Sequence, residues 1–426
     1  MVKTIKEFLK FLRTTVRRGF GLLWAATWLL RNRGVLKQKT IYLMWQQSFG
    51  HAILGLDMGA RTWHPVRTSL IYLVDANSNR KNEFLPCCFE KSFICHIITL
   101  HGTRGSIEAR YRGLRTVLRL LTWLRRDSQL CEHAPLMNRT DLYLKKSEST
   151  VRLFNHSTRQ KEFYHDPGYF ELLHSGKGVR PKLSKEILKQ FHNHDMLQKA
   201  GFFERPFITL LLRNRGAKDN SYYNHIRCSG PQENYRDAVH HFVQSGFHVV
   251  GTGETDHDEF INIEGYYSLD DLGLHPELTN LFALTECELF VGQHSGPFYL
   301  CSSCGIPVLL CDVMPYWQAA VRRDDLLVYK RVFAKGGRYL NPLEVFANHA
   351  DFAYGNTEAG ESYEVQDSLP EEILAGAKEM VQRLRSDQAQ EEDIHVKEYR
   401  SMLPVDMLVG KVGNCPPLEL LRAMKK

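Results

Sequence analysis

The sequence predicts an α/β protein with two domains built on parallel sheets, preceded by an amphipathic helix at the N-terminus. Short apolar runs of strand type alternate with helical segments over most of the chain, which is typical of parallel sheets covered by helices. Polar or glycine-containing turns follow three consecutive strands of the second half, and a basic segment occupies residues 1–38. We therefore expect a helix within 1–38, domains over 39–200 and 201–385, and a C-terminal tail over 386–426.

Length and charge restrict the class of protein. With 426 residues, 43% of them hydrophobic, the chain can bury two cores. Residues 1–38 carry nine basic side chains and one acidic side chain, so the rest of the chain sums to about −1 of the total +7. The folded body is therefore not basic overall, and we expect no nucleic-acid partner. The ten cysteines lack the spacing of a zinc site and indicate buried reduced thiols.

Residues 1–38 have the pattern of a helix that lies on a membrane surface. The uninterrupted apolar run Phe20–Leu30 is too short to cross a bilayer of about 30 Å, while Trp24 and Trp28 suit the headgroup level. The segment predicts a peripheral position on the anionic inner face of the cell membrane, facing the cytoplasm. A secretory signal and a helix packed on the protein itself are the alternatives. The apolar stripe consists of Ile5, Leu9, Leu12, Val16, Phe20, Leu23 and Leu30.

The first domain opens with a strand over Thr40–Trp45, and the turn after it leads into a helix near Ala52. His51 lies in that turn, at the edge of the sheet where open α/β domains bind ligands. An imidazole titrates near neutral pH, so His51 is the candidate general base. The alternative is a histidine that bonds only the local backbone. Further strands are expected over Thr68–Asp75 and Phe93–Thr99.

In the second domain, three consecutive strands end in groups that suit an anion. The carboxyl ends of parallel strands meet at one edge, so these groups should lie close together. Arginines at the end of a buried strand are costly without an anionic partner. The groups are Arg213 and Arg215 after the first strand, Gly251, Thr252 and Gly253 after the second, and His294, Ser295, Gly296 and Pro297 after the third.

The third of these turns has the form of a phosphate site. A helix over Phe298–Cys304 follows Gln293–Pro297, and the first N–H groups of a helix have no intrahelical acceptor, so they point at an anion. Pro297 suits the first helical turn, where its missing N–H costs nothing. An ordinary strand–helix crossover with a capped helix is the alternative.

Other chemistries have weaker signals. Asp256-His-Asp258 forms a D-x-D pattern, as a metal-dependent transferase would need, but it does not directly follow a strand. A nicotinamide enzyme would need a third glycine after Gly251-Thr-Gly253, and the sequence lacks it. A non-catalytic module that binds a sugar phosphate, a nucleotide or a membrane is the main alternative from another class, because an anion site does not require turnover.

The second half resembles a family of bacterial glycosyltransferases of the two-domain GT-B type and is distantly similar to O-fucosyltransferases. The resemblance covers roughly residues 205–384. Leu211-Leu212-Arg213 stands where the family has His-Val-Arg, and His294 stands where asparagine is common. The matching elements are Leu212-Arg213, Tyr235-Arg236, Val250–Gly253, Gly292–Gly296 and Leu369–Ile373.

The resemblance implies two Rossmann-like domains and transfer of a sugar from a nucleotide-sugar donor to a glycan or lipid-linked acceptor, as in polysaccharide biosynthesis. The second domain would bind the donor diphosphate through Arg213, Arg215 and Arg227 together with the two later turns. His51 of the first domain would deprotonate the acceptor. Arginine and helix N–H groups can stabilise a diphosphate leaving group, so we expect neither a metal nor a cofactor.

Overall fold

The computed structural model describes residues 2–45, 49–77, 82–125, 128–133, 151–155, 160–164, 179–213, 226–253, 255, 258–314, 322–348, 362–386, 392–404, 410 and 412–424, with backbone alone for 2–12, 49–51, 129, 132–133, 151–155 and 160–164. The described residues form two compact units, unit 1 up to Val179 and unit 2 from Arg180 onward. Each unit contains a mainly parallel sheet, which confirms the predicted fold class.

Unit 1 is built on a sheet with the strand order β3-β2-β1-β4-β5-β6. The pairs among β1 to β4 are parallel, and β5 and β6 add an antiparallel edge. The strand order reverses beside β1, which is where doubly wound sheets bind ligands. The elements are β1 (Thr40–Trp45), α2 (Phe49–Trp63), β2 (Thr68–Asp75), η2 (Leu85–Phe89), β3 (Phe93–Leu100), α3 (Arg104–Leu124), β4 (Gln129–His133), β5 (Val151–Asn155) and β6 (Gln160–Tyr164).

The N-terminal segment forms α1 (Val2–Arg31) and a short 3-10 helix, η1 (Arg33–Lys37), and α1 packs on α3. Ala25 and Leu29 are buried in the core of unit 1. Trp24 and Trp28, expected at the headgroup level of a membrane, are partly buried against that core. None of the described helices is long and apolar enough to cross a membrane.

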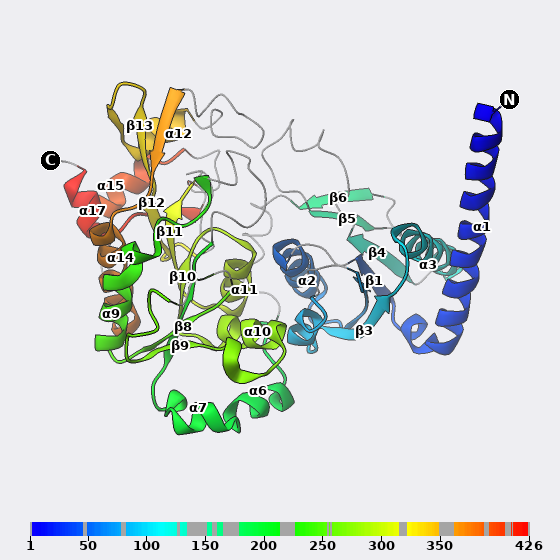
Figure 1. Ribbon diagram of the computed structural model, residues 1–426. Helices are drawn as coiled ribbons and strands as arrows, with labels where there is room; N and C mark the ends of the chain where they lie inside the picture. Colours follow the sequence, from blue (N-terminus) through cyan, green and yellow to red (C-terminus); the bar gives the residue numbers. More distant parts are fainter. Residues whose placement is uncertain are drawn as a thin grey trace. The chain divides into compact units, whose positions relative to one another are not determined.

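Unit 2 is built on a parallel sheet with the order β12-β11-β10-β7-β8-β9. Its first strand, β7, lies between β8 and β10, so the strand order reverses between β7 and β10. Figure 1 shows α9 and α14 on one face of this sheet and α10 and α11 on the other. The strands are β7 (Phe207–Leu211), β8 (His248–Gly251), β9 (Tyr266–Ser268), β10 (Leu289–Gly292), β11 (Val308–Val313) and β12 (Leu326–Tyr329).

The remaining elements of unit 2 are helices and a small antiparallel sheet of order β14-β13-β15. They are α6 (Lys185–His192), α7 (Asp195–Lys199), η3 (Phe202–Glu204), η4 (Gln232–Tyr235), α9 (Arg236–Gln244), η5 (Asp270–Leu272), α10 (Pro276–Glu286), α11 (Gly296–Cys304), β13 (Arg331–Ala334), β14 (Tyr339–Leu340), α12 (Pro342–Ala347), β15 (Tyr363–Gln366), α14 (Pro370–Arg385), α15 (Ile394–Met402) and α17 (Leu418–Ala423).

Unit 2 extends beyond both predicted limits of the second domain, residues 201 and 385. The segment before residue 200 belongs to unit 2, because Phe191 of α6 stacks on Phe282 of α10 with ring centroids 4.1 Å apart. The predicted tail is also part of this unit, where Tyr399 and Cys415 are buried. Contacts between residues far apart in the sequence decide both limits, and local composition does not report such contacts.

Candidate functional site

The strand ends singled out in the sequence meet at the carboxyl edge of the unit 2 sheet. Arg213 lies two residues after β7, Gly251 ends β8, and His294 lies two residues after β10. β7 pairs with both β8 and β10, so the three ends are neighbours. Arg213 and His294 therefore lie on either side of the point where the strand order reverses.

A chain of hydrogen bonds joins the ends of β7, β10 and β11. The Arg213 backbone N–H donates to Gln293 Oε1 at 2.7 Å, and Gln293 Nε2 donates to the Tyr235 hydroxyl at 2.9 Å. That hydroxyl donates to Asp312 Oδ2 at 2.5 Å. A carboxylate only accepts, so Tyr235 must donate to it, and this fixes the orientation of the Gln293 amide. We call Asp312, Tyr235 and Gln293 the strand-end network.

Asp312 is the centre of this network. It is 1% exposed and is the one described non-glycine residue with positive φ, at 52°. Its carboxylate also accepts the N–H groups of Gly230 at 2.7 Å and Ser368 at 2.8 Å, and Lys330 Nζ lies 3.9 Å from Oδ1. Lys330 is 2% exposed and also pairs with Asp367. A buried carboxylate with these partners holds three loops in one arrangement.

Tyr235 is buried, and burial together with the charge of Asp312 raises the pKa of its phenol well above the usual value. The phenol therefore stays neutral and remains a donor to Asp312 at physiological pH. Next to this network, the N–H and hydroxyl of Ser229 both donate to the Arg213 carbonyl, at 2.9 Å and 3.0 Å. The backbone of Arg213 is thus held from both sides.

His294 is buried beside two arginines. Arg227 Nη2 donates to the His294 carbonyl at 3.1 Å, and Tyr299 Oη lies 3.4 Å from the His294 Nε2. Burial first, and then the positive charges of Arg227 and Arg213, hold the pKa of His294 well below its usual value. The imidazole is therefore neutral, and one of its nitrogens can donate a hydrogen bond without adding charge.

Two buried polar atoms lie at the start of α11. Among the described residues, neither His294 Nδ1 nor Ser295 Oγ has a hydrogen-bond partner. Ser295 is the N-cap of α11, but its side chain makes no capping bond, and Pro297 lies in the first turn as expected. Unpaired polar atoms of this kind are costly, and here they stand beside the free N–H groups of a helix. The arrangement suits an anionic oxygen.

In the turn after β8, Thr252 makes hydrogen bonds within the protein. This residue is 5% exposed, its N–H donates to the Leu210 carbonyl at 3.0 Å, and its hydroxyl donates to Asn280. These hydrogen bonds hold the turn in place, and donor binding by Gly251, Thr252 and Gly253 stays a prediction. Gly253 is exposed with φ 73°, which favours glycine.

The remaining candidates are only partly described. His51 lies in the first turn of α2, directly after β1, and its side chain is outside the described part. Arg215 and Asp256 also lie outside it, while Asp258 is exposed. No group of metal-binding side chains occurs within the described ranges, and none of the ten cysteines forms a disulfide.

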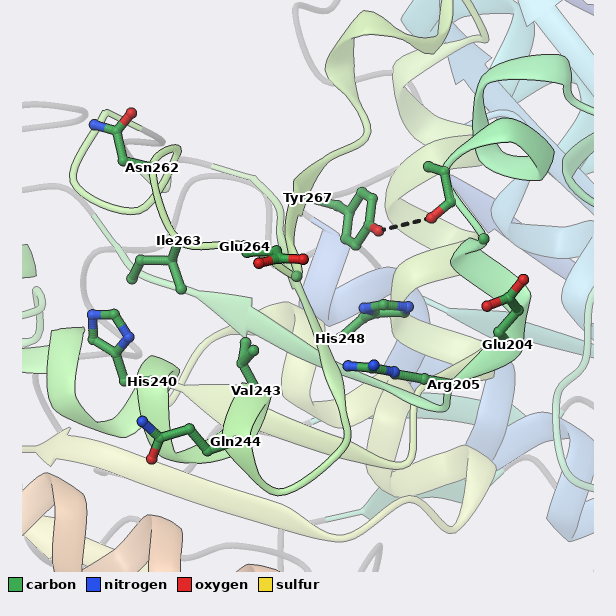
Figure 2. Close-up of a pocket in the computed structure, with 13 residues that line it drawn as sticks. Glu204, Arg205, His240, Val243, Gln244, His248, Asn262, Ile263, Glu264 and Tyr267 are labelled. Carbon is green, nitrogen blue, oxygen red and sulfur yellow. Dashed lines mark hydrogen bonds between the residues drawn. The ribbon is translucent and has the colours of Figure 1, made fainter.

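A cavity of about 580 Å³ lies at the opposite edge of the same sheet. Arg205, His248, Glu264 and Tyr267 line it, and His248 is the first residue of β8 (Figure 2). His248 packs on the rings of Phe202 and Tyr267. This cavity is at the amino ends of the strands, whereas the arginines, His294 and the helix N-terminus are at their carboxyl ends, so we do not assign it to the candidate site.

Comparison with known proteins gives structural neighbours only. No model of a known protein family matches the chain, and no curated protein matches it. One similar structure is a glycosyl transferase family 9 protein from Veillonella parvula, with TM-score 0.37 and 14% identity over 64% of this chain and 80% of that one. The ADP-heptose LPS heptosyltransferase II of E. coli has TM-score 0.38 and 11% identity over 74% of this chain and 98% of that one.

A UDP-GlcNAc 2-epimerase from Neisseria meningitidis, bound to UDP-GlcNAc, has TM-score 0.34 and 10% identity over 82% of this chain and 99% of that one. The expected similarity to O-fucosyltransferases finds no support among these structures. At this level of similarity, the geometry of the chain's own residues must carry any functional argument.

Proposed function

We propose that this protein is a glycosyltransferase that moves a sugar from a nucleotide-sugar donor to a glycan or lipid-linked acceptor at the cytoplasmic face of the membrane. The observation that carries the proposal is the meeting of Arg213, Arg227, His294 and the α11 N-terminus where the strand order of unit 2 reverses. Such a site offers positive charge and neutral donors to a diphosphate.

The groups have distinct roles in this proposal. Departure of the nucleoside diphosphate places negative charge on phosphate oxygens, and the guanidinium groups of Arg213 and Arg227 would stabilise that charge. The neutral His294 and the hydroxyl of Ser295 would donate hydrogen bonds from atoms that lack a partner in the described structure. Arg215 is proposed as a further diphosphate contact. No metal is required for this charge stabilisation.

His51 is the proposed general base of unit 1. It follows β1, beside which the strand order of that sheet reverses. His51→Ala should lower kcat by a factor of roughly 10² to 10⁴ and leave donor affinity unchanged. Normal turnover by this variant would remove His51 from the mechanism. Transfer that EDTA abolishes and Mn²⁺ restores would instead favour Asp256 and Asp258 and a metal-dependent reaction.

Arg213 provides the direct test of donor binding. Arg213→Ala should weaken the best-bound of ADP, GDP and UDP by about 1.5 to 3 kcal/mol, the usual range for a charged hydrogen bond. The matched control is Arg205→Ala, because Arg205 is exposed at the other end of β7. Calorimetry measures both. Equal affinity of Arg213→Ala and the parent for all three nucleotides would refute the assignment.

A nucleotide-sugar-binding protein without transfer activity is the second candidate. It is favoured by the location of Arg213, Arg227, His294 and the α11 N-terminus, all of which belong to unit 2. Slow release of nucleoside diphosphate from bound donor, with water as acceptor, distinguishes the two candidates. A protein that only binds the donor would release no nucleoside diphosphate.

A further inference from the structure

α1 packs on α3 through small residues. A Cβ built on Gly21 would lie 2.1 Å from the Ala109 carbonyl oxygen, and one built on Gly113 would lie 2.2 Å from the Gly21 carbonyl oxygen. The two backbones are therefore in direct contact at this crossing, which larger side chains would prevent. At Gly105 of α3, a Cβ would lie 2.6 Å from the guanidinium group of Arg17. α1 is thus a docked helix of unit 1.

This packing leaves one stripe of large apolar side chains of α1 exposed. Val16, Phe20, Leu23 and Leu30 are separated by four, three and seven residues, so they form one stripe along the helix. They are between 52% and 77% exposed. A helix normally buries such a stripe, because each side chain removed from water contributes favourably. The side of the helix that faces the protein carries Gly21, Ala25 and Leu29 instead.

α3 adds a second exposed apolar group. Leu120, Trp123 and Leu124 are between 55% and 69% exposed. Leu120 and Leu124 continue, at helical spacing, the stripe that contains Ala109 and Gly113, so they lie on the side of α3 that α1 covers near its other end. Eight of the sixteen large apolar side chains that are exposed in the described residues belong to these two helices. The α1–α3 surface is Val16, Phe20, Leu23, Leu30, Leu120, Trp123 and Leu124.

The charges around the α1–α3 surface are almost all positive. Between residues 13 and 39 there is no acidic side chain, and α3 contains one, Glu108, which lies near Arg104 at 3.8 Å and Arg112 at 3.3 Å. The exposed arginines of α1 and η1 are Arg13, Arg18, Arg31 and Arg33. A second copy of the same surface would bring these charges together, whereas an anionic bilayer would neutralise them.

We propose that the α1–α3 surface docks on an anionic lipid bilayer, with α1 in the plane of the interface and α3 as its support. The exposed apolar side chains enter the boundary between headgroups and acyl chains, and the arginines contact the anionic headgroups. Trp123 suits the headgroup level. This inference rests on the membrane location in the proposed function, but not on sugar transfer.

The test is flotation of the full chain with vesicles of phosphatidylcholine alone or with about one third phosphatidylglycerol, in low and high salt. We expect binding to the anionic vesicles only, weakened by salt. Leu23→Glu combined with Leu30→Glu should reduce binding at least about tenfold, since two leucines that would enter the bilayer are lost. The matched control, Ile394→Glu, changes a side chain 61% exposed in unit 2 and should bind as the parent does.

A second arm tests the charge. Replacing Arg18, Arg31 and Arg33 by alanine should reduce binding by about fivefold for each arginine near the surface. Melting temperatures equal to that of the parent would show that these exposed changes leave the fold intact. Binding that is unchanged in both the glutamate and the alanine variants would overturn the proposal.

The alternative occupant gives a different result. If the surface joins two copies, the parent is a dimer in solution, the Leu23→Glu and Leu30→Glu variant is a monomer, and neither floats with vesicles. That outcome would also overturn the proposal. Because no donor is present in these assays, failure of lipid binding and failure of sugar transfer are separate results.

Discussion

Asp312→Asn tests whether the strand-end network holds the candidate site together. Asparagine has nearly the same shape, and it tolerates the positive φ of 52° at this position. The substitution therefore changes the charge and one acceptor atom but adds little backbone strain. Its effect should come from the hydrogen bonds of the side chain.

The structure allows the cost to be estimated. The carboxylate accepts from Gly230, Tyr235 and Ser368 and lies 3.9 Å from Lys330 Nζ. All of these groups are donors, so the NH₂ group of asparagine must face at least one of them. Losing a charged hydrogen bond costs about 1.5 to 3 kcal/mol, and a donor is left buried without an acceptor. Together with the loss of charge beside Lys330, we expect a destabilisation of about 3 to 5 kcal/mol.

Hydrogen exchange measured by mass spectrometry, together with urea unfolding, provides the assay. Segments that contain Gly230 and Ser368 should exchange faster in the variant, because their N–H groups lose an acceptor. Affinity for nucleoside diphosphates should also fall, because Tyr235 and Gln293 connect Asp312 to the Arg213 backbone. The control is Asp271→Asn, an exposed position where we expect a change within about 0.5 kcal/mol. A destabilisation below about 1 kcal/mol with unchanged exchange would refute the role of Asp312.

His294, Gln293 and the crossing of α1 with α3 can each be tested by one substitution. The pKa of His294 is lower in the folded than in the unfolded protein. As the pH falls below about 6.5, the unfolded state therefore takes up a proton before the folded state does. The parent should thus lose thermal stability relative to His294→Gln between about pH 7 and pH 5. Gln293→Leu removes the acceptor of the Arg213 N–H, so nucleotide affinity measured by calorimetry should fall by about 1 kcal/mol; unchanged affinity would show that the network does not position Arg213. Gly113→Leu would collide with the Gly21 carbonyl and should make α1 sensitive to limited proteolysis at a cost of about 1 to 3 kcal/mol or more, whereas parent-like resistance would contradict the crossing.

The sequence was sufficient for the strands that form continuous apolar runs and for the edge of the sheet at which polar groups gather. Thr40–Trp45 and Thr68–Asp75 match β1 and β2 residue for residue, because a buried parallel strand needs a continuous apolar run between turns. Arg213 and His294 were proposed on the same basis, since each lies two residues after such a strand.

The partners of these residues could not be predicted in the same way. Gln293, Tyr235 and Asp312 were not proposed as site residues, because their hydrogen bonds depend on which strand lies beside which. β7 is next to β10 although β8 and β9 come between them in the chain. The one signal in the sequence was the position of Asp312 at the end of a buried strand. That position alone does not indicate that the carboxylate accepts a hydrogen bond from Tyr235.

The amphipathic pattern of the first 38 residues determined that α1 is a helix and which side carries its large apolar residues. Only the tertiary structure decided that the opposite side, which carries Gly21, Ala25 and Leu29, packs on the protein. The reason is steric. At Gly21 and Gly113 the backbones of α1 and α3 touch, so the face of α1 at this crossing must have a glycine where α3 comes closest. Hydrophobic periodicity reports which side chains of a helix favour burial. It carries no information about the shape of the surface on which the helix packs.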